Sequence, residues 1–315
     1  MGIPAPFSRI GVVGSGAVGC YFGAQLARAG AEVRFLMRGD LEAVRRRGTV
    51  VVHEVDGTME VRGFAACAAP AEVGPVDLVV LALKATSAAA VRGLVEPLLK
   101  EHTAILTLQN GLGADEYLAG IFGPARVMGG LVFMAINRVG PGEVRRLNRG
   151  SLAVGEFGRP AADRTHAFAA LLAGGGMKVQ VVENLEEARW RKLMWNIPFN
   201  GLSIAEGGIT TDRICGNPRL AGEARALMRE VQRAAAGFGH AIPDAFLDKQ
   251  FEVTPPMGPY QPSSLVDYLA GRAVEVETIW GEPLRRARAI GVPMPALADL
   301  YERLLVACPA PAGSS

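Results

Sequence analysis

Apolar and polar positions follow two different patterns along the chain, and the change between them divides the sequence into two parts. In the first part, short apolar runs alternate with helical patterns. The runs that predict strands cover residues 10–13, 31–37, 77–83, 104–108 and 127–133, with a hairpin over 50–61 that turns at Asp56-Gly57 and short β segments at 143–146, 152–155 and 178–182. This alternation predicts an α/β fold with a Rossmann-type, doubly wound parallel sheet.

From residue 184 onward the pattern is helical almost throughout. Helices are predicted over residues 185–205, 220–237, 245–251, 264–289 and 296–307. We therefore expect a Rossmann domain over residues 1–183, an all-helical domain over 184–308, and a disordered tail of Pro, Gly and Ser over 309–315.

The composition is that of a globular protein and argues against several kinds of partner. Half of the 315 residues are hydrophobic, and the net charge of +2 gives no reason to expect nucleic acid or an anionic membrane as a partner. No apolar stretch reaches the roughly 18 residues that span a bilayer, and the first strand leaves no room for a signal peptide, so we expect a cytoplasmic location. The four cysteines are then free thiols, and the four histidines form no cluster that predicts a metal site.

Three glycines follow the first predicted strand with the spacing G-x-G-x-x-G. Gly14 allows the tight turn out of the strand, Gly16 lets a pyrophosphate approach the backbone, and Gly19 lets the next helix pack close to the sheet. The N-terminus of that helix presents free N–H groups and a positive dipole end to a phosphate. The strand and the helix on either side of the glycines predict a dinucleotide site, with the candidate residues Gly14, Ser15, Gly16, Ala17, Val18 and Gly19.

The end of the second predicted strand bears on the choice between NAD and NADP. An NAD site usually has an acidic residue there, about 20 residues past the glycines, which holds the ribose 2′-hydroxyl. This chain has Leu36 and Met37, followed by Arg38. A neutral-to-basic strand end suits a 2′-phosphate, so we predict NADP(H) as the cofactor. The alternative is that Arg38 is a solvated surface arginine.

Two further strand ends carry polar residues, and ligands of doubly wound sheets bind beyond such ends. Lys84 follows the apolar run 77–83, where it is either a binding group or a simple strand-end charge. Asn110 follows the strand predicted over 104–108, within Gln109-Asn110-Gly111. Asn-Gly is also a common turn, so the pattern alone leaves both interpretations open.

Lys192, Asn196 and Asn200 recur every four residues in the helix predicted over 185–205, which places them on one face. Large apolar residues flank this stripe, and buried amides are unfavourable unless they are paired. The stripe therefore indicates either a polar cleft inside an apolar wall or a structural polar network. Pro198 lies within the helix, removes one backbone hydrogen bond and is expected to bend it.

A later segment, Pro262-Ser263-Ser264-Leu265-Val266-Asp267, is typical of a helix start with capping residues. Ser263 is either a binding residue or a plain N-cap. Glu275 follows within the same predicted helix, as a binding residue or as one more surface carboxylate.

Together these motifs resemble those of the 2-dehydropantoate 2-reductase (ketopantoate reductase) family. The resemblance covers nearly the whole chain in the family's order. It rests on Gly-x-Gly-Ala-Val-Gly at 14–19, Leu-Lys-Ala at 83–85, Gln-Asn-Gly at 109–111, the Lys/Asn/Asn stripe, and Pro-Ser-Ser-Leu…Asp…Gly-Arg…Glu-Val-Glu…Gly from 262 to 281. It implies a Rossmann domain that binds NADPH and a helical domain similar to that of the 6-phosphogluconate dehydrogenases. The implied reaction reduces 2-dehydropantoate, a 2-oxo acid, to (R)-pantoate on the route to pantothenate and coenzyme A.

The resemblance also implies a role for each matching residue. Lys192 is the general acid that protonates the carbonyl oxygen as hydride arrives, and Glu275 binds the hydroxyl end of the substrate. The other implied contacts are Asn110 between nicotinamide and substrate, Asn196, Asn200 and Ser263 on the substrate, and Lys84 and Arg38 on the cofactor, with Arg38 at the 2′-phosphate. The chemistry agrees, because hydride transfer builds negative charge on the ketone oxygen, and a cation with a proton to give stabilises that charge.

Two departures from the family pattern leave questions open. The family often has Ser-Met where this chain has Ser263-Ser264-Leu265, so Ser264 is the alternative to Ser263. Pro198 lies between the two asparagines and makes the position of Asn200 less certain than that of Asn196. The rival functions are a paralogous NADP-dependent reductase of another 2-oxo acid or of an imine, and an NADP-binding sensor without turnover. A homodimer is possible.

Overall fold

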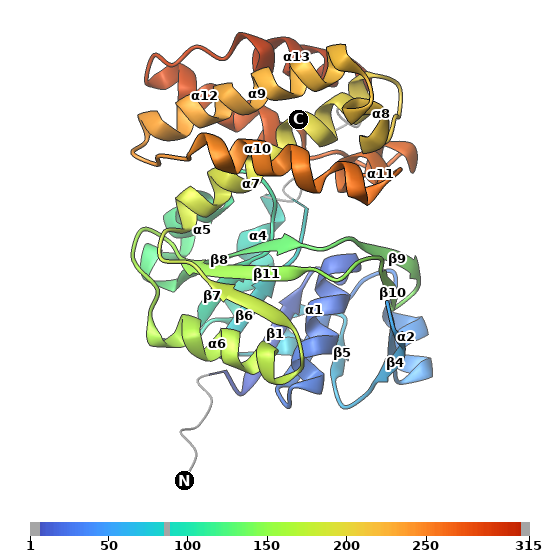
Figure 1. Ribbon diagram of the computed structural model, residues 1–315. Coiled ribbons are helices and arrows are strands. Elements are labelled where there is room, and N and C mark those ends of the chain that lie inside the picture. Colours follow the sequence, from blue (N-terminus) through green and yellow to red (C-terminus); the bar gives the residue numbers. More distant parts are fainter. Residues whose placement is uncertain (1–6, 85–88, 310–315) are drawn as a thin grey trace. The chain divides into compact units, whose positions relative to one another are not determined.

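The computed structural model describes residues 7–84 and 89–309, and the chain forms two compact units (Figure 1). The first unit contains the chain up to Gln109 together with Ala114–Leu185. The second contains the chain from Glu186 onward together with the short segment Asn110–Gly113. Each unit has its own apolar core. Residues 310–315, in the predicted disordered tail, lie outside the described residues.

The first unit contains an eight-stranded sheet with the strand order β12-β11-β8-β7-β6-β1-β2-β5. Its strands are β1 (Arg9–Val13), β2 (Glu32–Leu36), β5 (Ala65–Cys67), β6 (Leu78–Leu81), β7 (Ala104–Thr107), β8 (Val127–Phe133), β11 (Ser151–Glu156) and β12 (Lys178–Val181). β1 pairs in parallel with β2 on one side and with β6 on the other, so the chain reverses its direction of progress across the sheet at β1. This order is that of a Rossmann fold, and the predicted fold class is confirmed.

One part of the sheet is not parallel. β11 runs antiparallel to β8, and β12 is parallel to β11. The connection from β8 to β11 passes through two strands of a separate sheet rather than through a crossover helix. Because a parallel return requires a crossover, usually helical, the chain comes back antiparallel, and the sheet is mixed rather than purely parallel as predicted.

The second sheet of this unit has four strands in the order β4-β3-β10-β9. β3 (Val50–Glu54) and β4 (Gly57–Val61) form the predicted hairpin, and β10 (Glu143–Arg146) pairs with both β3 and β9 (Ile136–Gly140). β9 and β5 were not predicted from the sequence. Helix α1 (Ala17–Arg28) packs against β3, β9 and β10.

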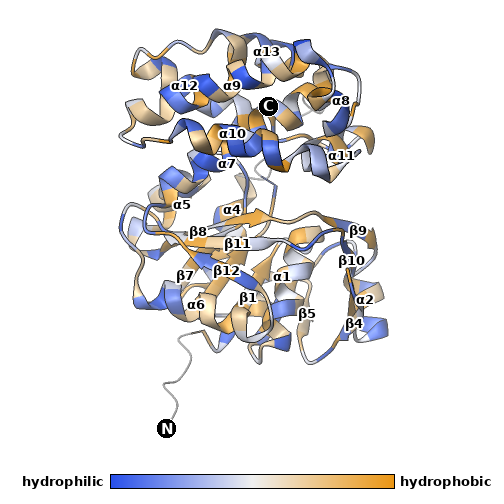
Figure 2. Ribbon diagram, viewed as in Figure 1, coloured by the Kyte–Doolittle hydropathy of each residue, from blue (hydrophilic) through white to orange (hydrophobic). Residues whose placement is uncertain are grey.

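Both faces of the large sheet are covered, and residues of one strand alternate between two apolar clusters. Ile10 and Val12 of β1 pack in a cluster with α1 and α6, whereas Val13 packs in a cluster with α4 and α5. Figure 2 shows the strands of this sheet mainly in the colours of hydrophobic residues. The remaining helices of the unit are α2 (Leu41–Arg47), α3 (Pro70–Val73), α4 (Val91–Val95) with a 3-10 turn at Glu96–Leu98, α5 (Ala114–Phe122), a 3-10 turn at Pro124–Arg126, and α6 (Asp163–Gly174).

The second unit is helical throughout its regular structure. Its elements are α7 (Leu185–Ala205), α8 (Thr211–Cys215), α9 (Pro218–Gly237), α10 (Asp244–Val253), a 3-10 turn at Pro255–Met257, α11 (Ser263–Leu269), a π-helical turn η5 (Glu277–Gly281), α12 (Glu282–Ala289) and α13 (Pro295–Ala307). The boundaries of α7 match the prediction, and this helix continues through Pro198 as a single element. Its core side chains include the fully buried Trp190 and Ile197.

The predicted single helix over residues 264–289 is wrong. α11 ends at Leu269, and Gly271 follows with a φ of +63°, in the left-handed region where glycine is favoured. The N–H of Arg272 then donates to the carbonyl of Asp267 at 2.9 Å, which is the closing bond of a Schellman motif. Glu275 therefore lies in a connecting segment before η5 and not in the helix of Ser263.

Candidate active site

The turn between β1 and α1 contains two glycines whose positions leave no room for a side chain. Gly14 has a φ of +101°, and a Cβ there would lie 2.7 Å from the carbonyl carbon of Ala82. A Cβ on Gly19 would lie 1.8 Å from the carbonyl oxygen of Gly14. Both glycines are therefore needed for the close packing of α1 against the strand ends.

Gly16 is different, because a Cβ there would meet no protein atom within 4 Å. It is exposed and is the N-cap residue of α1. The first helical N–H to find an intrahelical acceptor is that of Cys20, which donates to the Gly16 carbonyl at 2.9 Å. The N–H groups of Ala17, Val18 and Gly19 have no intrahelical acceptor, because they precede the first full turn. The open space at Gly16 and these donors fit the pyrophosphate of a dinucleotide.

Two of the other predicted residues follow strands next to β1. Arg38 is exposed and follows β2, and Lys84 is half-buried and follows β6. Since β1, β2 and β6 are parallel neighbours, their carboxyl ends meet at one edge of the sheet. The structure of the first unit thus brings Gly14–Gly19, Arg38 and Lys84 to the same edge.

Asp40 is an acidic residue near this edge, and no motif of the sequence singles it out. Its side chain is buried, 5 % exposed, and accepts the N–H of Gly142 at 2.8 Å. The Asp40 carboxylate also pairs with Arg138 of β9. The Asp40 carboxylate is thus bound to residues of the small sheet. We therefore do not count it as an acidic ligand of a ribose 2′-hydroxyl.

In the second unit, Lys192 lies on α7 and contacts the segment Asn110–Gly113. The Nζ atom of Lys192 donates to Oδ1 of Asn110 at 2.7 Å. An ammonium group has three N–H donors, and this bond uses one of them and fixes the direction of the side chain. Two residues predicted from motifs 82 positions apart are therefore in direct contact.

The environment of Lys192 favours loss of its proton near neutral pH. The pKa of Lys192 is lowered to about 7, chiefly because burial disfavours the charged ammonium. The nearby cation of Arg189 also lowers this pKa, and the carboxylate of Glu275 opposes both effects. A group with a pKa near the working pH is well suited to general acid–base catalysis.

The two asparagines of the α7 stripe have different surroundings. Asn200 is 1 % exposed, and its Oδ1 accepts the N–H of Ser264 at 2.9 Å. The N-cap residue of α11 is Pro262, and no side chain of its own caps the helix. Asn200 supplies the oxygen that accepts an N–H group at the start of α11. This contact fits the structural polar network that was one of the two interpretations of the stripe. Asn196 is 8 % exposed, and no hydrogen bond of its side chain is found among the described contacts.

The two candidate serines also differ. Ser263 is exposed in the first turn of α11, whereas Ser264 is buried against Asn200. The interpretation of Ser263 as the N-cap is wrong, because that position is occupied by Pro262. Both serines remain candidates for binding a substrate.

The segment Asn110–Gly113 is attached to the second unit by its backbone as well. The N–H of Leu112 donates to the carbonyl of Thr278 at 2.9 Å. In a π-helical turn this carbonyl would accept from residue 283, which is Pro283 and has no N–H. The Thr278 carbonyl is therefore left for Leu112. A Cβ on Gly111 would lie 2.1 Å from the same oxygen, so only glycine allows this approach.

Comparison with known proteins decides the family. The family described as "Ketopantoate reductase PanE/ApbA" matches residues 10–159, and its C-terminal counterpart, "Ketopantoate reductase PanE/ApbA C terminal", matches residues 184–306. A protein named 2-dehydropantoate 2-reductase from Nostoc sp. is 35% identical over 301 residues, which cover 94% of each chain. The chain belongs to the ketopantoate reductase family.

Solved structures of this family have the same fold. A 2-dehydropantoate 2-reductase from Geobacter metallireducens is 38% identical, with a TM-score of 0.91 and coverage of 95% of this chain and 99% of that chain. One from Methylococcus capsulatus is 32% identical, with a TM-score of 0.88 and coverage of 95% and 96%. As a ketopantoate reductase family member, the chain is an oxidoreductase that uses a nicotinamide cofactor.

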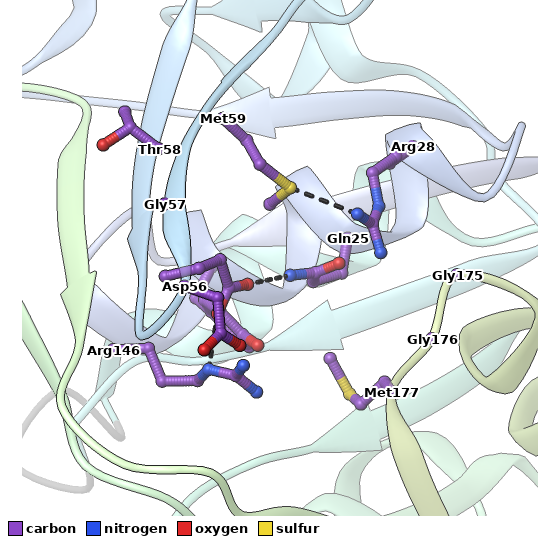
Figure 3. Close-up of a pocket in the computed structure, with 12 residues that line it drawn as sticks. Gln25, Arg28, Asp56, Gly57, Thr58, Met59, Arg146, Gly175, Gly176 and Met177 are labelled. Atoms are coloured by element: carbon purple, nitrogen blue, oxygen red, sulfur yellow. Dashed lines mark hydrogen bonds and ion pairs between the residues drawn. The ribbon is translucent and has the colours of Figure 1, made fainter.

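The first unit of this ketopantoate reductase family member also has a polar pocket of about 340 Å³, which lies along the later part of α1 (Figure 3). Gln25 donates to Glu54 at 2.7 Å, and Arg146 pairs with the same carboxylate at 2.5 Å. Arg28 contacts the sulfur of Met59 at 3.2 Å. No predicted site residue lines the described part of this pocket, and its polar contacts link α1 to the second sheet.

Other predicted properties can be compared with the described residues of this ketopantoate reductase family member. All four cysteines are free thiols, as predicted. Within residues 7–84 and 89–309, no group of three His, Cys, Asp or Glu side chains could hold a metal ion. None of the described helices combines the length and apolar character that a bilayer crossing requires.

Proposed function

We propose that this protein reduces 2-dehydropantoate to (R)-pantoate with NADPH, the reaction that supplies pantoate for pantothenate and coenzyme A. The observation that carries the proposal is the contact of the Lys192 ammonium with Asn110, in surroundings that lower the pKa of Lys192 to about 7. The names of the relatives from Nostoc, Geobacter and Methylococcus support the choice of substrate.

In this proposal residues 1–183 bind the cofactor and residues 184–308 bind the substrate. The turn Gly14–Gly19 holds the pyrophosphate, Arg38 the 2′-phosphate and Lys84 a further part of the cofactor. NADPH, when bound, supplies the hydride. The protein supplies orientation and the proton.

The proton comes from Lys192. As hydride reaches the ketone carbon, the C=O π electrons move onto the oxygen, and Nζ of Lys192 transfers a proton to that oxygen to give the alcohol. Asn110 holds the ammonium in place through the 2.7 Å hydrogen bond before the transfer. The positive charge of Lys192 also stabilises the oxygen as its negative charge develops.

Substrate recognition in this proposal falls to the remaining polar residues of the second unit. The amide of Asn196 binds the oxo acid, together with the NH2 group of the Asn200 amide, whose oxygen accepts the N–H of Ser264. Ser263 or Ser264 adds a hydroxyl group at the start of α11. Glu275, whose charge acts on Lys192, accepts the hydroxyl of the substrate.

The alternative function, an NADP-binding sensor without turnover, has less support than the reductase. A sensor that only binds NADP has no use for a lysine that loses its proton near neutral pH. A homodimer and a cytoplasmic location remain predictions of the proposal.

Arg38→Ala is expected to weaken NADPH binding by about 10- to 100-fold and NADH binding little, because a charge-assisted contact to phosphate contributes roughly 1.5–3 kcal/mol. The measurement is a fluorescence titration of parent and variant with both cofactors. Arg46→Ala, which removes another exposed arginine of the same region, is the control and should leave both affinities unchanged. Equal affinity of the parent for NADH and NADPH would rule out this assignment.

Glu275→Gln is expected to remove most of the preference for a substrate with a hydroxyl group. The parent should reduce 2-dehydropantoate more than about 100-fold faster, in kcat/KM, than 3-methyl-2-oxobutanoate, because that analogue has no hydroxyl group to donate to the Glu275 carboxylate. The measurement is kcat/KM for both oxo acids with both proteins. Glu277→Gln is the control, since Glu277 is exposed and pairs with Arg285. An unchanged ratio in Glu275→Gln would mean that another residue reads the hydroxyl.

A further inference from the structure

Arg189 is a buried cation that the motifs did not single out. It lies on α7 three residues before Lys192, so the two side chains leave the same side of the helix. Arg189 is only 5 % exposed. Burying a guanidinium group is unfavourable unless nearby groups compensate the loss of its hydration. A buried arginine beside the proposed acid is therefore a candidate for a role in the site.

We infer that Arg189 is a positioning residue that acts through Lys192 and through the segment Asn110–Gly113. The inference rests on the proposed function, in which Lys192 is the proton donor. Neither the family resemblance nor the motif spacing assigns a role to Arg189.

The first argument is the attachment of the segment. Nη1 of Arg189 donates to the carbonyl of Gly111 at 3.5 Å, next to the Lys192–Asn110 bond. The following residue, Leu112, donates to Thr278. Three consecutive residues are thus held by three different groups of the second unit. Loss of the Arg189 contact would leave the peptide between Gly111 and Leu112 held only by its N–H bond to Thr278, and we expect the neighbouring Asn110 side chain to be held less firmly.

The second argument is electrostatic. Within the described part of the chain, the pKa of Lys192 is lowered by the charge of Arg189 on α7 and raised by the charge of Glu275 in the segment before η5, while Asn110–Gly113 carries no charge. Without Arg189 only burial would oppose the effect of the carboxylate, so the ammonium would hold its proton more tightly and Lys192 would be a weaker acid.

The test measures the proton affinity of Lys192 directly, without substrate. Full-length protein is labelled with acetic anhydride over a range of pH, and the labelling rate of Lys192 is followed by peptide mass spectrometry. The variants are Arg189→Met, which removes the charge, Arg189→Lys, which keeps it, and Arg191→Met. Arg191→Met is the matched control, because Arg191 lies on the same helix but pairs with Glu187 at 2.7 Å. Arg189→Gln replaces Arg189→Met if that variant does not fold.

The expected result is a pKa of Lys192 near 7 in the parent, in Arg189→Lys and in Arg191→Met. In Arg189→Met it should rise by about one pH unit, a tenfold gain in proton affinity. A parent-like value in Arg189→Met, or an equal rise in Arg191→Met, would overturn the inference, because an arginine with a merely structural role would change stability and not this affinity.

Activity gives a second readout. Because the protonated lysine is the active form, kcat/KM for reduction falls as pH rises through the pKa of Lys192, and a higher pKa moves that fall to higher pH. The fall of kcat/KM at high pH should therefore occur at a higher pH in Arg189→Met and at the parent's pH in Arg189→Lys. If the parent reduces no 2-dehydropantoate, the proposed function fails, while the labelling result still decides how Arg189 acts on Lys192.

Discussion

Lys192→Met is expected to lower kcat by about 10²- to 10⁴-fold, the usual contribution of a general acid. Methionine keeps an unbranched apolar stem but removes the ammonium and its bond to Asn110. Affinity for NADPH should change little, because the predicted phosphate contacts, Gly14–Gly19 and Arg38, belong to the first unit and Lys192 belongs to the second. The measurement is steady-state reduction of 2-dehydropantoate, together with a titration of NADPH binding.

A matched control for this variant is Lys249→Met. Lys249 lies on α10, is exposed and pairs with Glu252 at 2.8 Å. The Lys249→Met variant should retain the activity of the parent. If Lys192→Met kept more than about half of the parent's kcat, the acid would have to be another group, and Lys84 would be the next candidate.

Two glycine variants in the β1–α1 turn should separate cofactor binding from folding. Gly16→Ala is expected to fold with the melting temperature of the parent, because its Cβ meets no protein atom within 4 Å. The methyl group would occupy the space through which a pyrophosphate approaches the backbone, so NADPH affinity should fall by about 10-fold or more. Gly19→Ala should instead destabilise the protein by about 1–3 kcal/mol or more, since its Cβ would lie 1.8 Å from the Gly14 oxygen.

The measurements are thermal unfolding and NADPH titration on each variant. Gly120→Ala is the control, because Gly120 lies in α5 with no neighbour within 4 Å of a Cβ, and alanine there should leave affinity unchanged. Normal NADPH affinity in Gly16→Ala would show that the dinucleotide does not pass over this turn.

The sequence predicted those parts of the fold whose signal is local. The glycine turn, the boundaries of α7, and strand β8 follow from apolar periodicity and from glycine spacing alone. β5, with the sequence Ala-Ala-Cys, has no β-branched or aromatic residue, and β9, with the sequence Ile-Asn-Arg-Val-Gly, does not alternate apolar and polar residues, so neither gave a strand pattern. The break at Gly271 shows the same limit, since a single glycine can either end a helix or be tolerated within it.

The candidate site was predictable residue by residue but not in its contacts. Lys192 and Asn110 were both singled out, but their hydrogen bond joins positions 82 residues apart. The need for glycine at position 111 comes from the Thr278 carbonyl, to which Pro283 cannot donate within the π-helical turn and which therefore accepts the N–H of Leu112. Arg189 gave no motif signal, because its importance depends on what lies beside it in the folded chain.

The most direct test of the proposed function is the oxidation of NADPH by the purified protein in the presence of 2-dehydropantoate, followed by the absorbance of the reduced nicotinamide. We predict rapid oxidation that yields (R)-pantoate, with kcat/KM in the range of about 10⁴–10⁸ M⁻¹s⁻¹ typical of natural substrates. It should be far slower with NADH or with 3-methyl-2-oxobutanoate. No oxidation with 2-dehydropantoate, or equal rates with both oxo acids, would contradict the proposed function.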